Sequence, residues 1–228
     1  MNRRGADGEK DRRNDNFIDD IGITADRVAS RFLNTSGEPV MDFVNHVDLG
    51  RVNIRIREQG NLPGRKGVFP FDITLIHEGK VAANFAVNTA WSLDIYHRIV
   101  TAGYQGMGLA SLCMAIIESI AKQSELDMEA DVVETDVLCD EEGDGIKDFE
   151  PIVVQRDVLE MLYKRGFLPG NDDSARLVEQ VRTEDGFRTV STTEGVKAVP
   201  KKRPQRISDF SLLMKKSFNK GGGNFIAG

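Results

Sequence analysis

Residues 100–122 read "VTAGYQGMGLASLCMAIIESIAK", with three glycines between an extended segment and an amphipathic one. The segment before them, 92–100, favours a β-strand. After the glycines, apolar residues recur at intervals of three and four, which predicts a helix with one face on a sheet. They are Leu109, Leu112, Cys113, Ile116, Ile117 and Ile120. A strand that turns through glycines into a helix presents free backbone N–H groups and a positive dipole end, as phosphate sites do.

The familiar nucleotide-binding loops do not fit this stretch. A Walker loop requires Gly-Lys-Ser or Gly-Lys-Thr, which the stretch does not contain. A Rossmann fingerprint requires a third glycine where Ser111 stands, and it follows the first strand of a parallel sheet. A tight glycine turn before a core helix is the alternative that involves no ligand.

Alternating apolar residues predict antiparallel strands upstream of the loop. Residues 52–56 alternate as Val, Asn, Ile, Arg and Ile. Two more alternating stretches, 69–75 and 81–87, flank a turn at 77–80, as in an antiparallel hairpin. With a fourth strand at 92–100, this part of the chain predicts an antiparallel sheet.

Further helices are expected on both sides of these strands in the sequence. Residues 17–35 favour one or two short helices, and 130–138 favour a strand. A last helix is expected to begin near Pro151 and to end at Gly166. The order predicts an α/β (α+β) fold, with a central mixed, mostly antiparallel twisted sheet flanked by helices.

Charge and glycine content set the expected domain limits. Residues 1–16 are expected to form a flexible charged arm, 17–218 a single domain, and 219–228 a flexible Gly-rich tail. Within the domain, 169–206 is expected to be an elaboration, including a small hairpin around the Asp-Gly pair at 185–186.

Residues 105–110, "QGMGLA", resemble the acetyl-CoA loop of the GNAT superfamily of N-acetyltransferases, whose motif is (Q/R)-x-x-G-x-(G/A). Members often read "V-x-P-x-Y-R-G-x-G-I-G", and here Ala102 replaces the proline. Two landmarks follow in the family's order. "LYKRGF" at 162–167 resembles its "L-Y-x-K-x-G-F", and "LMKK" at 213–216 resembles its closing strand. The Asn that often opens the former helix is replaced by Arg156.

The resemblance implies acetyl-CoA as co-substrate and assigns residues to it. The amides of the loop would hold the pyrophosphate, and the residues concerned are Gln105, Gly106, Met107, Gly108, Leu109 and Ala110. The backbone of Ile99 and Val100 would pair with the pantetheine arm as another strand does. The function implied is transfer of an acetyl group to an amine by direct attack; the alternative is a non-catalytic acyl-CoA-binding module.

Tyr163 and Asp94 are the candidate catalytic residues that the resemblance implies. Tyr163 falls on the family's Tyr position and would protonate the departing thiolate. Asp94 stands six residues before Val100, where the histone-acetylating branch has a carboxylate base. His97 is a competing base, and water alone is a third possibility. Regular alternation along the strand predicts that Asp94 shares a face with Val100 and that His97 lies on the opposite face.

Neither a nucleophilic cysteine nor a metal site is expected. Cys113 lies on the apolar face of its predicted helix, which indicates a small core residue. The acidic stretch 140–150 resembles the first half of an EF-hand loop. Position twelve of that loop would be Pro151 in place of the bidentate Glu, which argues against calcium binding.

Composition sets the expected location and partners. The net charge of −6 argues against a dedicated nucleic-acid binder, and no apolar run approaches a membrane span. With two cysteines and no apolar segment after the N-terminal charges, a cytoplasmic protein is expected. The acidic run 127–148 suggests a cationic small-molecule or peptide amine as acceptor, and the basic run 197–220 is a solvated surface or a docking segment. A homodimer through an exposed edge strand is possible.

Overall fold

The computed structural model of the protein describes residues 7–35, 37–60, 66–134, 153–192, 195–201 and 212–218, with side chains from Ile21 onward. The chain forms two compact units. Unit 1 comprises residues up to Met128 together with the segment from Ser217, and unit 2 comprises Glu129–Lys216. The limits expected for a single domain stay a prediction.

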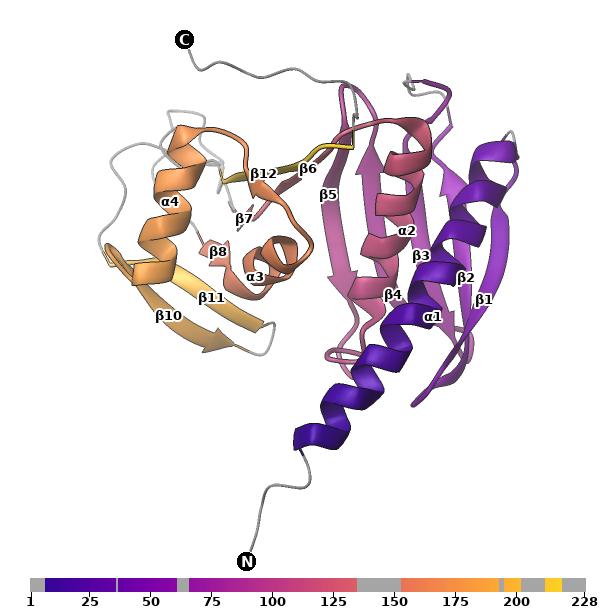
Figure 1. Ribbon diagram of the computed structural model, residues 1–228, viewed down its shortest axis with the longest axis horizontal. Helices are drawn as coiled ribbons and strands as arrows, with labels where there is room; N and C mark the ends of the chain where they lie inside the picture. The colour runs from indigo at the N-terminus through magenta and orange to yellow at the C-terminus, as the bar shows by residue number, and fades with distance from the viewer. Residues whose placement is uncertain are drawn as a thin grey trace, which may run out of the picture. The chain divides into compact units, whose positions relative to one another are not determined.

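Unit 1 contains a five-stranded antiparallel ladder in sequence order (Figure 1). Its strands are β1 (Val40–His46), β2 (Gly50–Glu58), β3 (Phe71–His77), β4 (Lys80–Asn88) and β5 (Leu93–Val100). Each strand pairs antiparallel with the next. The predicted fold class, a mostly antiparallel sheet flanked by helices, is confirmed.

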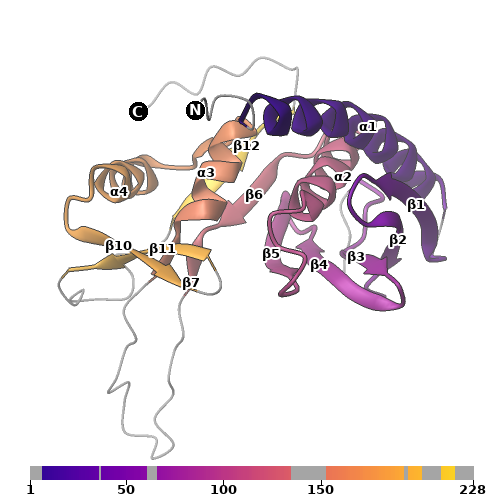
Figure 2. The same cartoon turned by 90° about the horizontal axis from the view of Figure 1, so that it is seen from below.

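Two helices lie side by side on one face of this ladder, as Figures 1 and 2 both show. Helix α1 spans Asp7–Asn34, so it extends into the stretch for which a flexible arm was expected. Helix α2 spans Leu109–Ser124, and all six of its predicted apolar positions are buried. Among the described residues, no helix is both long and apolar enough to cross a membrane.

The helix-facing side of the ladder forms the core of unit 1. The alternating residues of β2 and β3 are fully buried there, as their period of two predicts. They are Val52, Ile54, Ile56, Phe71, Ile73 and Leu75. Val81 was expected to continue this pattern on β4, but it is exposed. The pairing of β3 with β4 shifts between Leu75 and Ile76, which moves Val81 to the face away from the helices.

Polar contacts of Ser119 and Arg27 are among those that hold α1 in unit 1. The Ser119 hydroxyl of α2 donates to the Asp26 carboxylate of α1 at 2.5 Å, and Ser119 is buried. The Arg27 guanidinium donates through Nε and Nη2 to the two carboxylate oxygens of Asp42 on β1, at 3.1 and 3.0 Å. The Asp42 side chain is nearly buried, so this forked pair specifies how α1 lies against β1.

Unit 2 is built from short strands and two helices. In chain order they are β6 (Met128–Asp131), β7 (Val133–Glu134), β8 (Val153–Gln155), α3 (Arg156–Lys164), β9 (Leu168–Pro169), α4 (Asp172–Thr183), β10 (Phe187–Thr192), β11 (Gly195–Pro200) and β12 (Leu213–Lys216). β12 lies between β6 and β9, and the other four form a ladder in the order β10-β11-β8-β7. The predicted closing strand is thus present as β12.

The sequence-based predictions for unit 2 need two corrections. The helix expected near Pro151 begins at Arg156, because Val153–Gln155 pairs with β7 and β11 as strand β8. The hairpin expected around 185–186 is wrong: helix α4 runs to Thr183, and the hairpin is β10–β11.

The Ser119→Ala variant tests the polar contact between the two helices of unit 1. It removes the hydrogen bond from Ser119 to Asp26 and the one that Ser119 accepts from Gln123 at 3.0 Å, and we expect a loss of about 1 kcal/mol in unfolding free energy. For a chain of this size that lowers the thermal midpoint by roughly 2–4 °C, measurable by circular dichroism. Ser191→Ala, at an exposed serine of β10, is the control. Equal midpoints for the two variants would contradict the account.

Candidate functional site

The loop between β5 and α2 begins with a tight turn anchored to β4. Thr101 donates its backbone N–H to Ala82 O at 3.0 Å and its hydroxyl to Val81 O at 2.8 Å. The Tyr104 N–H then bonds to Thr101 O at 3.0 Å, and Gly103 has a φ of 92°. A positive φ at the third residue of such a turn is typical of type II, whose second residue is favourable for proline. Ala102 occupies that position, so the family's proline would fit this backbone.

The second half of the loop has the backbone pattern of an anion-binding concavity. Gly106 and Gly108 have φ of 76° and 75°, whereas Met107 between them does not have a positive φ. Such alternation turns successive N–H groups toward one point. The first intrahelical bond is Leu112 N–H to Gly108 O at 3.0 Å, so the amides of the first helical residues have no intrahelical acceptor. The first turn of α2 holds no acidic residue that would repel an anion.

Two histidines at strand ends contact this loop, and sequence reasoning missed both. His46, the last residue of β1, is buried, and its Nε2 lies 2.6 Å from Met107 O. His77, the last residue of β3, has its Nδ1 3.2 Å from the Tyr104 hydroxyl. The two rings stand 61 and 27 residues from their loop partners, and no sequence motif connects them.

The face of β5 that carries Asp94 differs from the prediction. The pairing of β4 with β5 shifts between Ala86 and Val87, with Asn88 opposite Asp94 and Ala86 opposite His97. Residues directly opposite each other point to the same side of a sheet. Since Asn88 and Ala86 are two residues apart on β4, Asp94 and His97 lie on the same face.

The cause of this difference is a β-bulge at Tyr96, which has no partner of its own on β4. The extra residue reverses the alternation, so Val100 lies on the helix side, opposite Ala83, and Asp94 does not share its face. Ile99 is half exposed on the side of Asp94. The two candidate bases, expected on opposite faces, are therefore on one face.

A polar network holds the bulge on the side of the sheet away from the helices. Gln59, just after β2, donates its side-chain amide to Asp72 Oδ1 at 2.7 Å and to the Tyr96 hydroxyl at 3.0 Å. Tyr96 is more than half exposed. Both α1 and α2 lie on the other face, so within unit 1 no described helix covers the side that carries Asp94 and His97.

Tyr163 lies in unit 2, on helix α3. Its ring is half-buried, and the guanidinium carbon of Arg182 lies 5.5 Å from the ring centroid, in cation–π contact. The loop, Asp94 and His97 belong to unit 1. The structure therefore groups those parts of the predicted site within one unit, and the approach of Tyr163 to them stays a prediction.

Arg156 stands where the GNAT motif often has Asn, and its side chain forms hydrogen bonds within unit 2. Its guanidinium donates to Glu184 Oε1 at 3.2 Å and to the Thr189 hydroxyl, joining the start of α3 to the region between α4 and β10. The hydrogen bond from Thr189, followed by that from Arg156, lowers the pKa of Glu184. This contribution to stability is present at neutral pH and is lost as acid protonates Glu184.

Cys113, the cysteine among the described residues, is not suited to act as a nucleophile. Cys113 is fully buried in α2, and burial raises the pKa of its thiol, so a nucleophilic thiolate is disfavoured. Cys139 and the acidic stretch 140–150 lie outside the described residues. Within the described ranges, no three His, Cys, Asp or Glu side chains are grouped as a metal would require.

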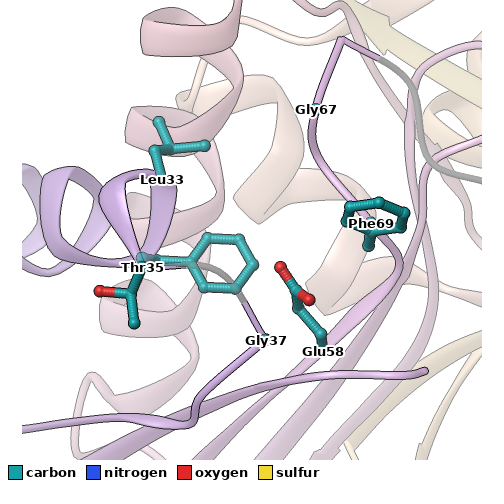
Figure 3. A pocket seen from close by; sticks show the side chains of 7 residues that line it. Leu33, Thr35, Gly37, Glu58, Gly67 and Phe69 are labelled. Carbon is teal, nitrogen blue, oxygen red and sulfur yellow. The ribbon is translucent and has the colours of Figure 1, made fainter.

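A hollow of about 270 Å³ opens at the other end of the sheet (Figure 3). Its lining comes from the end of α1, the end of β2 and the segment before β3: Phe32, Leu33, Thr35, Gly37, Glu58, Gly67 and Phe69. Glu58 is the charged residue of this lining, and no basic side chain is present to bind phosphate. The hollow shares no residue with the loop.

No protein-family description matches the sequence, and no curated protein matches it. A solved structure from Bacillus anthracis strain Ames, assigned as a streptothricin acetyltransferase and solved in complex with acetyl coenzyme A, is similar with a TM-score of 0.39. The two sequences are 11% identical, and the similarity covers 70% of this chain and 65% of that chain. Similarity at this level carries no functional argument.

The Gly106→Ala variant tests whether the loop backbone matters for a ligand. A Cβ at Gly106 meets nothing within 4 Å, so the strain comes from its φ of 76° and costs about 1 kcal/mol. Gly186→Ala is a matched control in unit 2, with a φ of 75° and the same open surroundings. We expect similar losses in thermal midpoint for both, but weaker coenzyme A binding, by about tenfold, for Gly106→Ala alone. Equal affinities in calorimetry would contradict a role of the loop in binding.

Proposed function

We propose that the protein is an N-acetyltransferase that moves an acetyl group from acetyl-CoA to an amine. The observation that carries the proposal is the junction of β5 and α2, where Gly106 and Gly108 have positive φ and turn successive backbone amides toward one point. The loop sequence at 105–110 matches the GNAT acetyl-CoA motif, and the "LYKRGF" and "LMKK" landmarks follow in the family's order. A glycine turn without a ligand would not need this combination.

Coenzyme A would bind with its pyrophosphate on the amides of residues 105–110 and its pantetheine arm along β5. From Val100 to the bulge at Tyr96 the strand covers about 13 Å, at roughly 3.3 Å per residue. A bulge leaves backbone groups of its extra residue out of the ladder. An N–H group freed at Tyr96 or His97 is a candidate donor to the oxyanion that forms when an amine attacks the thioester.

The reaction requires a base, an oxyanion donor and an acid. The acceptor nitrogen forms a bond to the acetyl carbon, the carbon–sulfur bond breaks, and the amine proton passes to a base. Asp94 and His97 are the candidate bases, and their common face allows one to accept the proton directly and the other to orient the amine. Tyr163 is the candidate acid that protonates the thiolate of coenzyme A.

An amine with a cationic character is the proposed acceptor class, such as a polyamine or a peptide amine. The net charge of −6 and the acidic run 127–148 favour the approach of a cation. The second candidate function is a module that binds acyl-CoA without catalysis. The departure at Arg156, which is engaged with Glu184 and Thr189, is the observation that favours it.

Kinetics with a panel of polyamines and peptide amines tests the proposal. We expect release of free coenzyme A and a 42 Da mass increase of one acceptor, because an acetyl group replaces one hydrogen of the amine. Removal of a general acid or base lowers turnover by about 10²–10⁴-fold, so Tyr163→Phe and either Asp94→Asn or His97→Gln should show this loss.

Asp173→Asn is the matched control, because Asp173 is an exposed carboxylate on α4 whose ion pair is with Arg176 of the same helix. Its turnover should equal that of the wild type. Turnover insensitive to all three site variants would show that the catalytic residues are wrongly assigned. Coenzyme A binding without turnover on any acceptor would favour the non-catalytic module.

A further inference from the structure

We propose that His46 and His77 are positioning residues, which hold the loop between β5 and α2 in its ligand-binding shape before coenzyme A arrives. The inference rests on the proposed function, because the ligand concerned is the pyrophosphate of coenzyme A. It concerns two side chains that neither the sequence motif nor the catalytic scheme uses. Four hydrogen bonds carry the inference, and they connect the loop to both histidines through the backbone of Leu49.

The partners of His46 fix which of its ring nitrogens carries the proton. The backbone N–H groups of Asp48 and Leu49 donate to His46 Nδ1 at 3.0 and 3.2 Å. Nδ1 is therefore an acceptor, and in the neutral ring Nε2 carries the hydrogen. Nε2 lies 2.6 Å from Met107 O, so His46 donates to this loop carbonyl. The ring is buried, where such a bond is not in competition with bulk water.

His77 has the same tautomer for a similar reason. Its Nε2 lies 2.9 Å from Leu49 O, and a carbonyl can only accept, so Nε2 carries the hydrogen. Nδ1 then accepts a hydrogen bond from the Tyr104 hydroxyl, whose oxygen lies 3.2 Å away. The rings of His77 and Tyr104 also meet edge to face, with centroids 5.7 Å apart.

The contacts form a closed ring that starts and ends in the loop. Met107 is bonded to His46, His46 to the Leu49 N–H, the Leu49 carbonyl to His77, and His77 to Tyr104. Leu49, in the turn between β1 and β2, thus bonds to both histidines: its N–H to His46 and its carbonyl to His77. Two points of the loop, three residues apart, are fixed to the ends of β1 and β3.

The bond to Met107 orients the amide that follows it. All described peptide bonds are trans, so the carbonyl of Met107 and the N–H of Gly108 point in opposite directions. Because His46 holds the carbonyl, the Gly108 N–H is directed away from His46. The carbonyl is also kept from turning toward the anion, where its partial negative charge would repel a phosphate.

A loop held in this shape loses less conformational entropy when a ligand binds. Gln105 and Gly106, between the two fixed points, are exposed, and glycine is the residue with the most backbone freedom to lose. Preorganisation raises affinity by removing that cost from the binding step. The histidines should therefore affect the affinity for coenzyme A, and the KM for acetyl-CoA, more than kcat.

Calorimetry with coenzyme A on the full chain tests the inference. His46→Ala should weaken binding about tenfold, since each tenfold change corresponds to about 1.4 kcal/mol and a lost hydrogen bond to a buried partner is of this order. His46→Gln should stay within about threefold of the wild type, because a glutamine amide can both donate to Met107 O and accept a backbone N–H. His77→Ala should weaken coenzyme A binding as His46→Ala does. The loss of affinity in the double variant should be smaller than the product of the two single losses, because either change alone breaks the circle of hydrogen bonds.

Ser119→Ala is the control for a general loss of stability, since it removes a buried hydrogen bond between the helices and leaves the loop contacts intact. A His46→Ala protein with a lower thermal midpoint but unchanged affinity would overturn the inference and leave the proposed function standing. Wild-type protein that binds no coenzyme A would overturn both. If His46→Ala does not fold, Tyr104→Phe decides: binding about threefold weaker supports the inference, and unchanged binding overturns it.

Discussion

A helix that begins after a short glycine-containing loop has first N–H groups without an acceptor inside the helix, and this constraint shapes the junction of β5 and α2 in unit 1. β5 has ended its ladder at Val100, and α2 makes its first internal bond only at Leu112. The first N–H groups of α2 therefore have no acceptor within the helix. Gly106 and Gly108 turn these amides together, and the ends of β1, β3 and β4 hold the loop by hydrogen bonds. This arrangement supports the proposed binding of a phosphate at the loop.

The bulge at Tyr96 is the second feature on which the proposed chemistry depends. One extra residue in β5 brings Asp94 and His97 onto the same face and takes Tyr96 out of the pairing with β4. The same strand thus leads from the proposed phosphate site at its end to the candidate bases and to Tyr96, which has no partner on β4. An extended ligand anchored by its phosphates at the loop would present its other end to these groups.

The sequence predicted the regular parts of unit 1 because their patterns are local. The period of two in β2 and the repeat of three and four in α2 both describe buried faces correctly. The face of Asp94 could not be predicted, because a bulge changes the alternation without changing the composition of the strand. The roles of His46 and His77 depend on tertiary contacts. Helix α4 was missed although Asn171 caps it by accepting from the Ser174 N–H, a signal present in the sequence.

Thermal unfolding with acetyl-CoA tests the central claim, that the loop binds coenzyme A, most directly. At about a hundred times the dissociation constant, a ligand bound to the native state alone adds ~2.7 kcal/mol to the unfolding free energy. For a protein of this size the midpoint should rise by about 5–11 °C. The account predicts this rise with acetyl-CoA and not with NAD or ATP. A midpoint unchanged by acetyl-CoA would show that the glycine loop is a structural turn and would contradict the account.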